Sequence, residues 1–559
     1  MNIFVKNKKL RIFLICLLCG VLLGLSFPPF NKWFFVYFGV LLLLYLIFSS
    51  SRLRQAFLRA YFALLVFNEI TLYWISGWHS DDIFLKIGGV ATVLVHPLLF
   101  MIPVLTIYGI SRYKKELALI LFSFIWVGFE YYHNVWQLSF PWLELGNTET
   151  YNLNRIQYIE FTGVHGISFL ICIISSLMYF LIERIYNKKW RITSKQAILY
   201  YFVLMILILF PNFYSYHRLK QDNSKYFQTM DSSKIINACV VQTNTDPFKK
   251  WSGNHDQLID SYIAKLNVGM KYNPDMMVLH ETAAPYYFLE DYNFLKSKRF
   301  FDFVDSSRKY LVMGIPHIEY YKDSAFVPKD AKKMSISGRF YDTYNSVIMI
   351  EPGKNRKDLT IHKKSKLVPF SERVPYQETL TFLRDWIKWG VGISSWQIGK
   401  DETIFTIKDS NLNTKFASLI CFESVFSEYV SKSVNNRAGF LVIVTNDGWF
   451  GHTSGPVQHE KYAVLRAIEN RKWIVRCAQT GISCFIDPLG NAYDEIPYGT
   501  EGIIDRNIIA NDEKTFYSSN GDIIGIISHY GGIISLVFCI GFYIYKRINK
   551  KKLNFLSDD

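Results

Sequence analysis

Three residue types that could act together in acyl transfer each follow an apolar, strand-like segment of the chain: a glutamate, a lysine and a cysteine. Glu281 stands in MMVLHETAAP. Desolvation in a cleft there would raise its pKa and suit it to general-base work. A loop carboxylate near a helix N-terminus explains the same residue when it is taken alone.

Lys364 lies in HKKSKLVPFSERVP, eight residues before Glu372. In a cleft its ammonium would stabilise a developing oxyanion, and Glu372 could pair with it. On the surface the same segment would be an ordinary basic turn. Cys421 ends the apolar run FASLIC, and it is either an inert buried residue or a nucleophile activated by a neighbouring glutamate and lysine.

No metal site is expected from the histidines. His452 and His459 are seven residues apart, with Glu460 next to the second, and this is not the i,i+4 pair of a helical zinc site. The helix predicted over 459–471 contains Arg466 and Glu469 at a spacing that favours a structural ion pair. Gly-rich phosphate loops are absent from the sequence, and we expect no cofactor.

The composition of the chain divides it into three parts. With 559 residues, 50% of them hydrophobic, and a formal net charge of +15, it is too long for one ordinary domain and too apolar for a disordered protein. Long apolar runs fill the two ends. We expect a transmembrane domain over 1–213, an outer domain over 214–522, and a last transmembrane helix with a basic tail over 523–559.

Eight segments are long and apolar enough to cross a bilayer as helices. They are 11–27, 33–49, 57–78, 87–111, 117–133, 163–183, 197–213 and 523–545. Lysine and arginine are concentrated in every second loop and at both ends of the chain, as eight spans with both termini in the cytoplasm require. The same count places residues 214–522 on the periplasmic or extracellular face.

The positive charge follows this topology. Five segments on the predicted cytoplasmic side have a combined charge of +16: 1–11, 50–59, 112–116, 183–195 and 546–559. The whole chain has a net charge of +15, so all other residues together carry about −1. Because almost nothing is left for the rest of the chain, the basic excess records membrane orientation. We therefore expect no nucleic-acid partner.

Two acidic residues lie inside the predicted spans. Glu69 sits a little past the middle of its span and is the better functional candidate, since ionisable groups at depth usually face a cavity or a partner. Glu130 lies near the outer end of its span, where simple interfacial placement explains it as well.

The outer domain alternates strand-like and helix-like segments. Apolar, β-branched runs occur at 235–242, 275–279, 311–315, 344–350, 416–421, 440–446 and 473–478. Near-continuous apolar strands indicate sheets that are covered on their faces, and hence a layered α/β or α+β domain.

These segments resemble known motifs. HETAAP (280–285), KKSKLVPFSERVP (363–375) and LICFES (419–424) resemble the Glu, Lys and Cys motifs of the nitrilase superfamily. Further segments resemble the apolipoprotein N-acyltransferase family more specifically: VQTNTDPFKKW (241–251), FPWLELG (140–146), TNDGWFG (445–451), GPVQH (455–459), QTGIS (479–483) and TFYSSNGD (515–522). The resemblance covers nearly the whole chain. It implies a polytopic α-helical membrane protein of eight spans with an inserted α/β nitrilase-like αββα sandwich domain.

The resemblance also implies a reaction and its residues. An acyl chain would pass from a membrane phospholipid to the α-amine of the diacylglyceryl cysteine of a bacterial apolipoprotein. Cys421 matches the nucleophile, Glu281 the general base, Lys364 the oxyanion-stabilising lysine and Glu372 a second active-site acid. The implied location is the inner membrane, with a periplasmic catalytic domain, and we expect a monomer.

Two further residues match supporting positions of the site, and two depart from the family. Trp251 and Glu423 match a tryptophan near the site and an acid just after the nucleophile. Phe422 stands where the family commonly has tyrosine, and Ser519 where arginine is common. The backbone N–H of Phe422 can still stabilise an oxyanion together with Lys364, so neither departure touches the triad.

The segment 376–398 is interpreted as a mobile apolar lid. It holds Leu380, Phe382, Leu383, Trp386, Ile387 and Trp389. An ordinary amphipathic surface helix would show the same periodicity.

Other classes of protein agree less well with this sequence. A membrane-anchored amidase could use the same triad, but one span would anchor it. A transporter would show more charged residues in its spans and an inverted repeat of broken helices. An inactive interaction platform would not need all three triad positions together.

Overall fold

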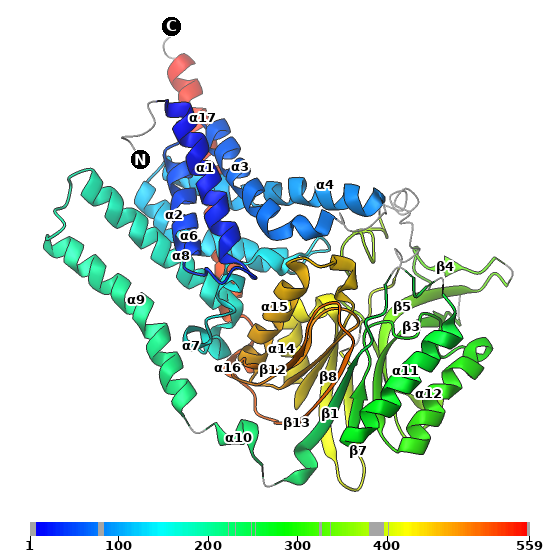
Figure 1. Cartoon of the computed structure of the whole chain (residues 1–559). Helices are drawn as coiled ribbons and strands as arrows, with labels where there is room; N and C mark the ends of the chain where they lie inside the picture. Colours follow the sequence, from blue (N-terminus) through cyan, green and yellow to red (C-terminus); the bar gives the residue numbers. More distant parts are fainter. Residues whose placement is uncertain are drawn as a thin grey trace.

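The computed structural model consists of a bundle of apolar helices standing on a domain built around two β-sheets (Figure 1). It describes residues 7–76, 83–221, 223–229, 231–247, 249–251, 253–322, 327–335, 337–379, 396–400 and 402–555. The bundle combines the first part of the chain with its last helix, so the two-sheet domain is an insertion between them.

The bundle contains a helix at the place of every predicted span. They are α1 (Lys8–Ser26), α2 (Phe35–Phe48), α3 (Leu53–Leu72), α4 (Ile83–Leu99), α5 (Met101–Ser111), α6 (Lys115–His133), α8 (Ile159–Tyr186), α9 (Lys195–Lys220) and α17 (Ile523–Phe555). Among the described residues, six stretches are long and apolar enough to cross a membrane, whereas α2 is shorter and α6 is not among them. The last helix begins at the predicted residue, and α9 continues to Lys220.

The fourth predicted span, 87–111, consists of two helices. α4 and α5 meet at Phe100, and α4 lies crosswise to α1 and α2 (Figure 1). Pro97 and Pro103 flank the junction. Each lacks the N–H that would continue the backbone ladder, which explains why one apolar run forms two helices.

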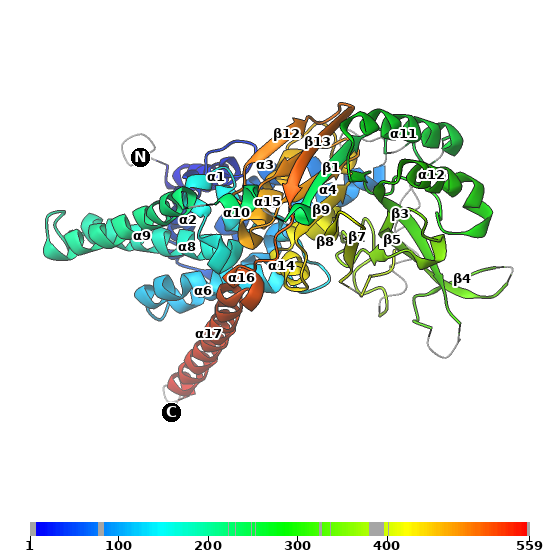
Figure 2. The same ribbon diagram turned by 90° about the horizontal axis from the view of Figure 1, so that it is seen from below.

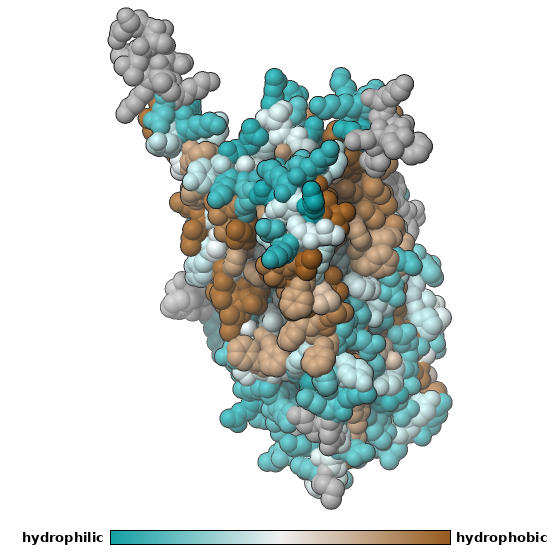
Figure 3. All heavy atoms as spheres, turned by 90° about the vertical axis from the view of Figure 1, so that its left-hand side faces the viewer, coloured by the Kyte–Doolittle hydropathy of each residue, from teal (hydrophilic) through white to brown (hydrophobic). Residues whose placement is uncertain are grey.

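Apolar side chains form a belt around the bundle. Seen from the side of α9, the hydrophobic residues gather between a polar cap and the polar lower domain (Figure 3). α9 supplies several of the large exposed ones: Leu199, Phe202, Leu209, Phe210 and Phe213. In water this exposure would be unfavourable, and in a bilayer it places apolar atoms against lipid.

The inserted domain has one seven-stranded and one six-stranded sheet. Their orders are β13-β1-β2-β3-β5-β4, with β6 on β5, and β12-β11-β10-β9-β8-β7. The strands are β1 (Ile235–Gln242), β2 (Met276–Val278), β3 (Tyr310–Tyr320), β4 (Lys332–Lys333), β5 (Phe340–Ile350), β6 (Ile361–Lys363), β7 (Ile404–Lys408), β8 (Asn413–Ile420), β9 (Phe440–Thr445), β10 (Ile474–Ala478), β11 (Ser483–Ile486), β12 (Ala492–Ile496) and β13 (Gly502–Ile509). The seven predicted strands correspond to β1, β2, β3, β5, β8, β9 and β10.

Helices cover the outer faces of both sheets. The sheets face each other across a shared apolar core that includes Val240 and Val312 of the first and Phe416 and Val442 of the second. α11 (His255–Gly269) and α12 (Phe294–Ser307) pack on the first sheet (Figure 2). α14 (Ser427–Asn435) and α15 (Gly455–Asn470) pack on the second sheet and on the membrane bundle, within one continuous core.

Buried polar contacts join the bundle to the inserted domain. Arg471, which ends α15, donates to Gln157 Oε1 at 2.5 Å and to Glu160 Oε2 at 2.8 Å. His165 Nδ1 of α8 lies 2.5 Å from Asp522 Oδ2, directly before α17. The predicted pair of Arg466 with Glu469 is confirmed, at 2.8 Å between Nε and Oε2. The two parts therefore share polar contacts as well as a core.

The two intramembrane acids have the opposite environments from those expected. Glu69 is exposed on α3. Glu130 is buried, and its Oε1 accepts hydrogen bonds from Trp126 Nε1 at 3.0 Å and from the backbone N–H of Leu145 at 2.9 Å. Glu130 therefore holds the connection that follows α6. The position of a residue along a span predicts its depth, but not which way it faces.

Gly128 allows α6 to pack closely on α17. A Cβ at this position would lie 2.2 Å from the backbone oxygen of Ser528. Small residues permit such close helix contacts in membranes. We expect Gly128→Ala to cost about 1–3 kcal/mol, as overpacking does, and to lower the thermal unfolding midpoint in detergent.

Gly541→Ala is the matched control, because Gly541 lies on α17, the partner helix of α6, and a Cβ there would meet nothing within 4 Å. Its midpoint should equal that of the wild type. Equal losses in the two variants would contradict this account of the packing.

Candidate active site

The side chains of Glu281, Lys364 and Glu372 meet at the edge of the first sheet. Glu281 follows β2 and Lys364 follows β6 directly. Lys364 Nζ lies 3.1 Å from Glu281 Oε1 and 2.8 Å from Glu372 Oε1. All three side chains are buried, with Lys364 1% exposed. The structure thus brings together three of the residues that the sequence singled out.

Asn345 of β5 completes this group, and sequence reasoning missed it. Its Nδ2 donates to Glu281 Oε1 at 2.7 Å and to Glu372 Oε1 at 3.2 Å. Its backbone oxygen accepts from the backbone N–H of Lys364 at 2.8 Å. One residue therefore fixes both carboxylates and the lysine between them. Within the segment YNSVIMI, nothing distinguishes Asn345 from other polar residues of a strand.

The charges of this group are strongly coupled. Burial alone would lower the pKa of the Lys364 ammonium, but the carboxylates of Glu281 and Glu372 raise this pKa above its ordinary value. Burial also raises the pKa of Glu372, against the opposing effect of Lys364. Lys364 is therefore a cation throughout the neutral range, as an oxyanion-stabilising group must be.

Cys421 stands at the end of β8 in a strained backbone conformation. Its φ is 48°, in the left-handed region that non-glycine residues rarely adopt. Burial raises the pKa of its thiol, Glu281 raises it further, and Lys364 lowers it. The resting side chain is therefore a thiol that needs a base. All eight cysteines lie in the described part of the chain and are free.

Glu423 and Phe422 support the turn that carries Cys421. Glu423 is fully buried. Its carboxylate accepts from the backbone N–H of Ile420 at 2.7 Å and of Ser365 at 2.6 Å, and so it ties the end of β8 to the segment of Lys364. The ring of Phe422 packs edge-on against Phe426, with 5.0 Å between centroids. Glu423 thus supports this turn through its carboxylate, and Phe422 supports it through ring packing.

Trp251 is connected to Glu281 through its neighbour Lys250. Lys250 Nζ lies 5.7 Å from the centroid of the Trp251 ring. It donates to Thr282 Oγ1 at 2.7 Å and to Gln479 Oε1 at 2.6 Å, so it holds the loop that follows Glu281. Burial lowers the pKa of Lys250 to about 7, and Glu281 opposes this shift. The role of Lys250 was not predicted.

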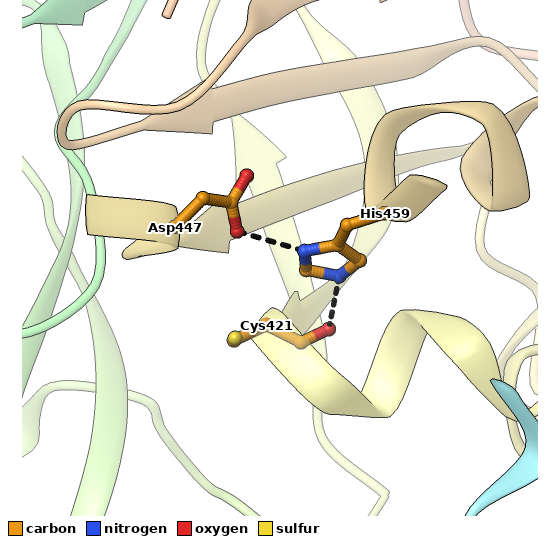
Figure 4. A group of neighbouring side chains, drawn as sticks. All are labelled: Cys421, Asp447 and His459. Carbon is orange, nitrogen blue, oxygen red and sulfur yellow. Dashed lines mark hydrogen bonds and ion pairs between the residues drawn. The ribbon is translucent and has the colours of Figure 1, made fainter. Parts of the chain in front are cut away.

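His459 contacts the backbone of Cys421, which the spacing of the histidines did not reveal. One ligand-type atom each of Cys421, Asp447 and His459 lies within 4.8 Å of the others (Figure 4). Asp447 Oδ1 lies 2.8 Å from His459 Nδ1, and Asp447 Oδ2 accepts from Arg476 at 2.6 Å. The carboxylate is therefore already engaged, and the adjacent guanidinium would repel a metal cation. The group fits a hydrogen-bonded chain better than a metal site.

Most of the predicted lid, 380–395, lies outside the described residues. Its flanks are placed. The backbone N–H of Tyr376 donates to Gln137 Oε1 of the bundle, and the backbone N–H of Trp396 donates to the backbone oxygen of Glu372 at 3.1 Å. One flank thus contacts the membrane domain and the other contacts the buried acid of the site.

Both parts of the chain are similar to known proteins. Residues 19–177 match the model of the apolipoprotein N-acyltransferase N-terminal domain, and residues 238–515 match that of the carbon-nitrogen hydrolases. An apolipoprotein N-acyltransferase of Chlorobaculum tepidum is 30% identical over 545 residues, covering 94% of this chain and 96% of the relative. One of Geobacter metallireducens is 27% identical over 525 residues, covering 92% of each. A solved nitrilase-superfamily member of Saccharomyces cerevisiae covers 50% of this chain and 92% of its own, at 18% identity and a TM-score of 0.35.

The buried Lys250 should make stability depend on pH. Because its pKa falls from 10.5 to about 7 on folding, the unfolded chain binds a proton between these values that the folded chain does not. Stability from this group therefore rises with pH across the window, by at most about 1.4 kcal/mol per unit. We expect Lys250→Met to remove that rise, measured as unfolding midpoints at several pH values in the window.

The neighbouring Lys249→Met serves as the control, since the Lys249 side chain is 87% exposed. It should leave the pH profile of the wild type unchanged. If Lys250→Met gave a profile parallel to that of the wild type, the depressed pKa would be wrong.

Proposed function

The chain belongs to the apolipoprotein N-acyltransferase family, and from this premise we propose how its own residues perform the N-acylation of lipoproteins. The acyl donor is a membrane phospholipid, and the acceptor is the α-amine of a diacylglyceryl cysteine. The observation that carries the proposal is the buried Lys364, 3.1 Å from Glu281 and 2.8 Å from Glu372, electrostatically coupled to the Cys421 thiol.

The first half-reaction forms a thioester. Glu281 removes the proton of the Cys421 thiol, and the sulfur attacks the ester carbonyl of the phospholipid. Lys364 and the backbone N–H of Phe422 stabilise the oxyanion that develops. The carbon–oxygen bond then breaks, and Glu281 protonates the departing lysophospholipid. The acyl chain stays on Cys421.

The second half-reaction uses the same groups in the same order. Glu281 removes a proton from the lipoprotein amine, whose nitrogen attacks the thioester carbonyl, and the oxyanion is stabilised as before. The carbon–sulfur bond breaks, the amide forms, and Glu281 returns the proton to sulfur. Because the first product leaves before the acceptor reacts, the kinetics are ping-pong.

The membrane bundle supports this choice of substrates. Both carry acyl chains, and moving a chain into water costs about 0.8 kcal/mol per CH₂. A catalytic domain that shares one core with apolar helices can receive such chains directly from the bilayer. A water-soluble amide would not require this arrangement.

The proposed topology has eight spans, both termini in the cytoplasm and the αββα domain in the periplasm, in the inner membrane of a bacterium. The alternation of basic loops supports it. We further propose that the enzyme acts as a monomer, without a cofactor, and that Trp251, Glu372 and Glu423 support the triad.

The thioester can be trapped. Purified protein incubated with a phospholipid labelled in its acyl chain should gain label that hydroxylamine releases. Cys421→Ala should gain none, Glu281→Gln should lose acylation, and Lys364→Ala should slow it by roughly 10²–10³-fold. Cys539→Ala removes a free thiol from α17 and should label normally. Label that persists in Cys421→Ala would end the proposal.

The topology predicts which residues react with a membrane-impermeant maleimide in intact cells with a permeabilised outer membrane. Asp302→Cys, at an exposed position on α12 of the inserted domain, should react. Lys188→Cys, at an exposed position in the connection between α8 and α9, should react only after the inner membrane is disrupted. The reverse pattern would invert the orientation.

A further inference from the structure

The peptide that joins Cys421 to Phe422 is held on its carbonyl side. Ser424 Oγ donates to the backbone oxygen of Cys421 at 2.7 Å, and His459 Nε2 lies 3.2 Å from the same oxygen. A peptide group is planar, so fixing this oxygen also fixes the opposite N–H, which belongs to Phe422. In the proposed reaction that N–H is an oxyanion donor.

His459 is itself fixed at its other nitrogen. Nδ1 lies 2.8 Å from Asp447 Oδ1, and Arg476 and Thr445 hold that carboxylate in turn, at 2.6 and 2.8 Å. The imidazole thus lies between the Asp447 carboxylate and the Cys421 carbonyl (Figure 4). The Cys421 sulfur also lies within 4.8 Å of a ring nitrogen, but the hydrogen bond from the ring to this residue goes to its backbone oxygen.

The residue before His459 in α15 is bound entirely by the membrane domain. Gln458 Nε2 donates to the backbone oxygens of Pro28, at 2.9 Å, and Thr71, at 3.1 Å. Its Oε1 accepts from the indoles of Trp74, at 3.0 Å, and Trp142, at 2.7 Å. Both donor hydrogens and both acceptor positions of this buried amide are used. Gln458 thus fixes the first turn of α15 relative to α1, α3 and the connection after α6.

We propose that Gln458 and His459 are positioning residues that let the membrane bundle set the oxyanion hole. The bundle fixes Gln458, the same turn of α15 carries His459, and His459 aims the N–H of Phe422. The strained φ of 48° at Cys421 requires such external support, because the chain alone would relax to another conformation. This inference rests on the proposed function, of which it specifies how the site is assembled.

The far end of α15 provides a matched control. Gln157 of the bundle is also a buried amide between the two parts of the protein: its Oε1 accepts from Arg471 at 2.5 Å, and its Nε2 donates to the backbone oxygen of Leu489 at 3.0 Å. Gln157 contacts the C-terminal end of α15, which is the end farther from Cys421. Losing it should weaken the joint between the two parts without altering the Cys421–Phe422 peptide.

The test separates oxyanion stabilisation from thiol chemistry in the full-length protein. Acylation of Cys421 is measured with labelled phospholipid and with p-nitrophenyl butyrate. Alkylation of Cys421 by iodoacetamide, followed by mass spectrometry, needs the thiol but no oxyanion hole. The variants are His459→Leu, Gln458→Met, the milder Gln458→Glu, which keeps the two acceptor positions, and Gln157→Met as the control.

We expect His459→Leu and Gln458→Met to lower the acylation rate at saturating donor by roughly 10- to 100-fold, below the cost of deleting an oxyanion donor outright. The donor concentration at half-saturation and the alkylation rate should stay roughly unchanged, and Gln458→Glu should be intermediate. The double variant that combines His459→Leu with Gln458→Met should lose no more acylation rate than His459→Leu alone, since both changes act through one carbonyl. Gln157→Met should lower the unfolding midpoint but acylate normally.

Several results would overturn the inference: normal acylation in His459→Leu, a parallel loss of alkylation, additive losses in the double variant, or an equal loss in Gln157→Met. The two donors keep it apart from the proposed function. If the wild type accepted the nitrophenyl ester but not the phospholipid, the donor assignment would fail, and the positioning residues would still be tested with the ester.

Discussion

A buried cation shared by two carboxylates is the constraint around which the inserted domain is organised. A buried lysine that stays charged needs charged partners at hydrogen-bond distance, and Lys364, which is 1% exposed, has Glu281 and Glu372. These three come from two connections, Glu281 from the one after β2 and the other two from the one after β6, so these connections must converge. β5 makes them do so, because Asn345 binds both carboxylates through its side chain and Lys364 through its backbone. The register of one strand thereby sets the geometry of the site.

The second half of the site depends on the opposite sheet and on the membrane. Cys421 directly follows β8, whose outer face is covered by α14 and α15, and these helices pack on the bundle within a continuous core. The group of Lys364, Glu281 and Glu372 is fixed from the first sheet, whereas the turn that carries Cys421 is fixed from the bundle side. The ring of Phe422, next to Cys421, lies 6.2 Å from that of Phe140 in the membrane domain, so this half of the site lies against the bundle.

Local sequence patterns predicted many of the strands and site residues. They failed where the role of a residue depends on a partner that is distant in sequence. The apolar run 235–242 coincides with β1, and three motifs brought Glu281, Lys364, Glu372 and Cys421 into one hypothesis. Asn345, Lys250 and His459 were missed because their importance depends on partners far away in sequence. β12 and β13 were missed because their side chains are only partly buried, and so their pattern is not that of a core strand. Glu69 is exposed and Glu130 is buried, the reverse of what was expected, since depth in a span does not fix the side that a residue faces.

The position of α17 behind the inserted domain has a consequence for biosynthesis. This helix packs on α5, α6 and α8, and the residue before it, Asp522, pairs with the buried His165. During translation these surfaces stay open until α17 emerges, after the inserted domain. A chain that stalls before α17 leaves His165 with Glu144 at 3.4 Å but without Asp522, and it leaves Gly128 of α6 without the helix that packs on it. Closure of the bundle therefore depends on prior synthesis of the inserted domain.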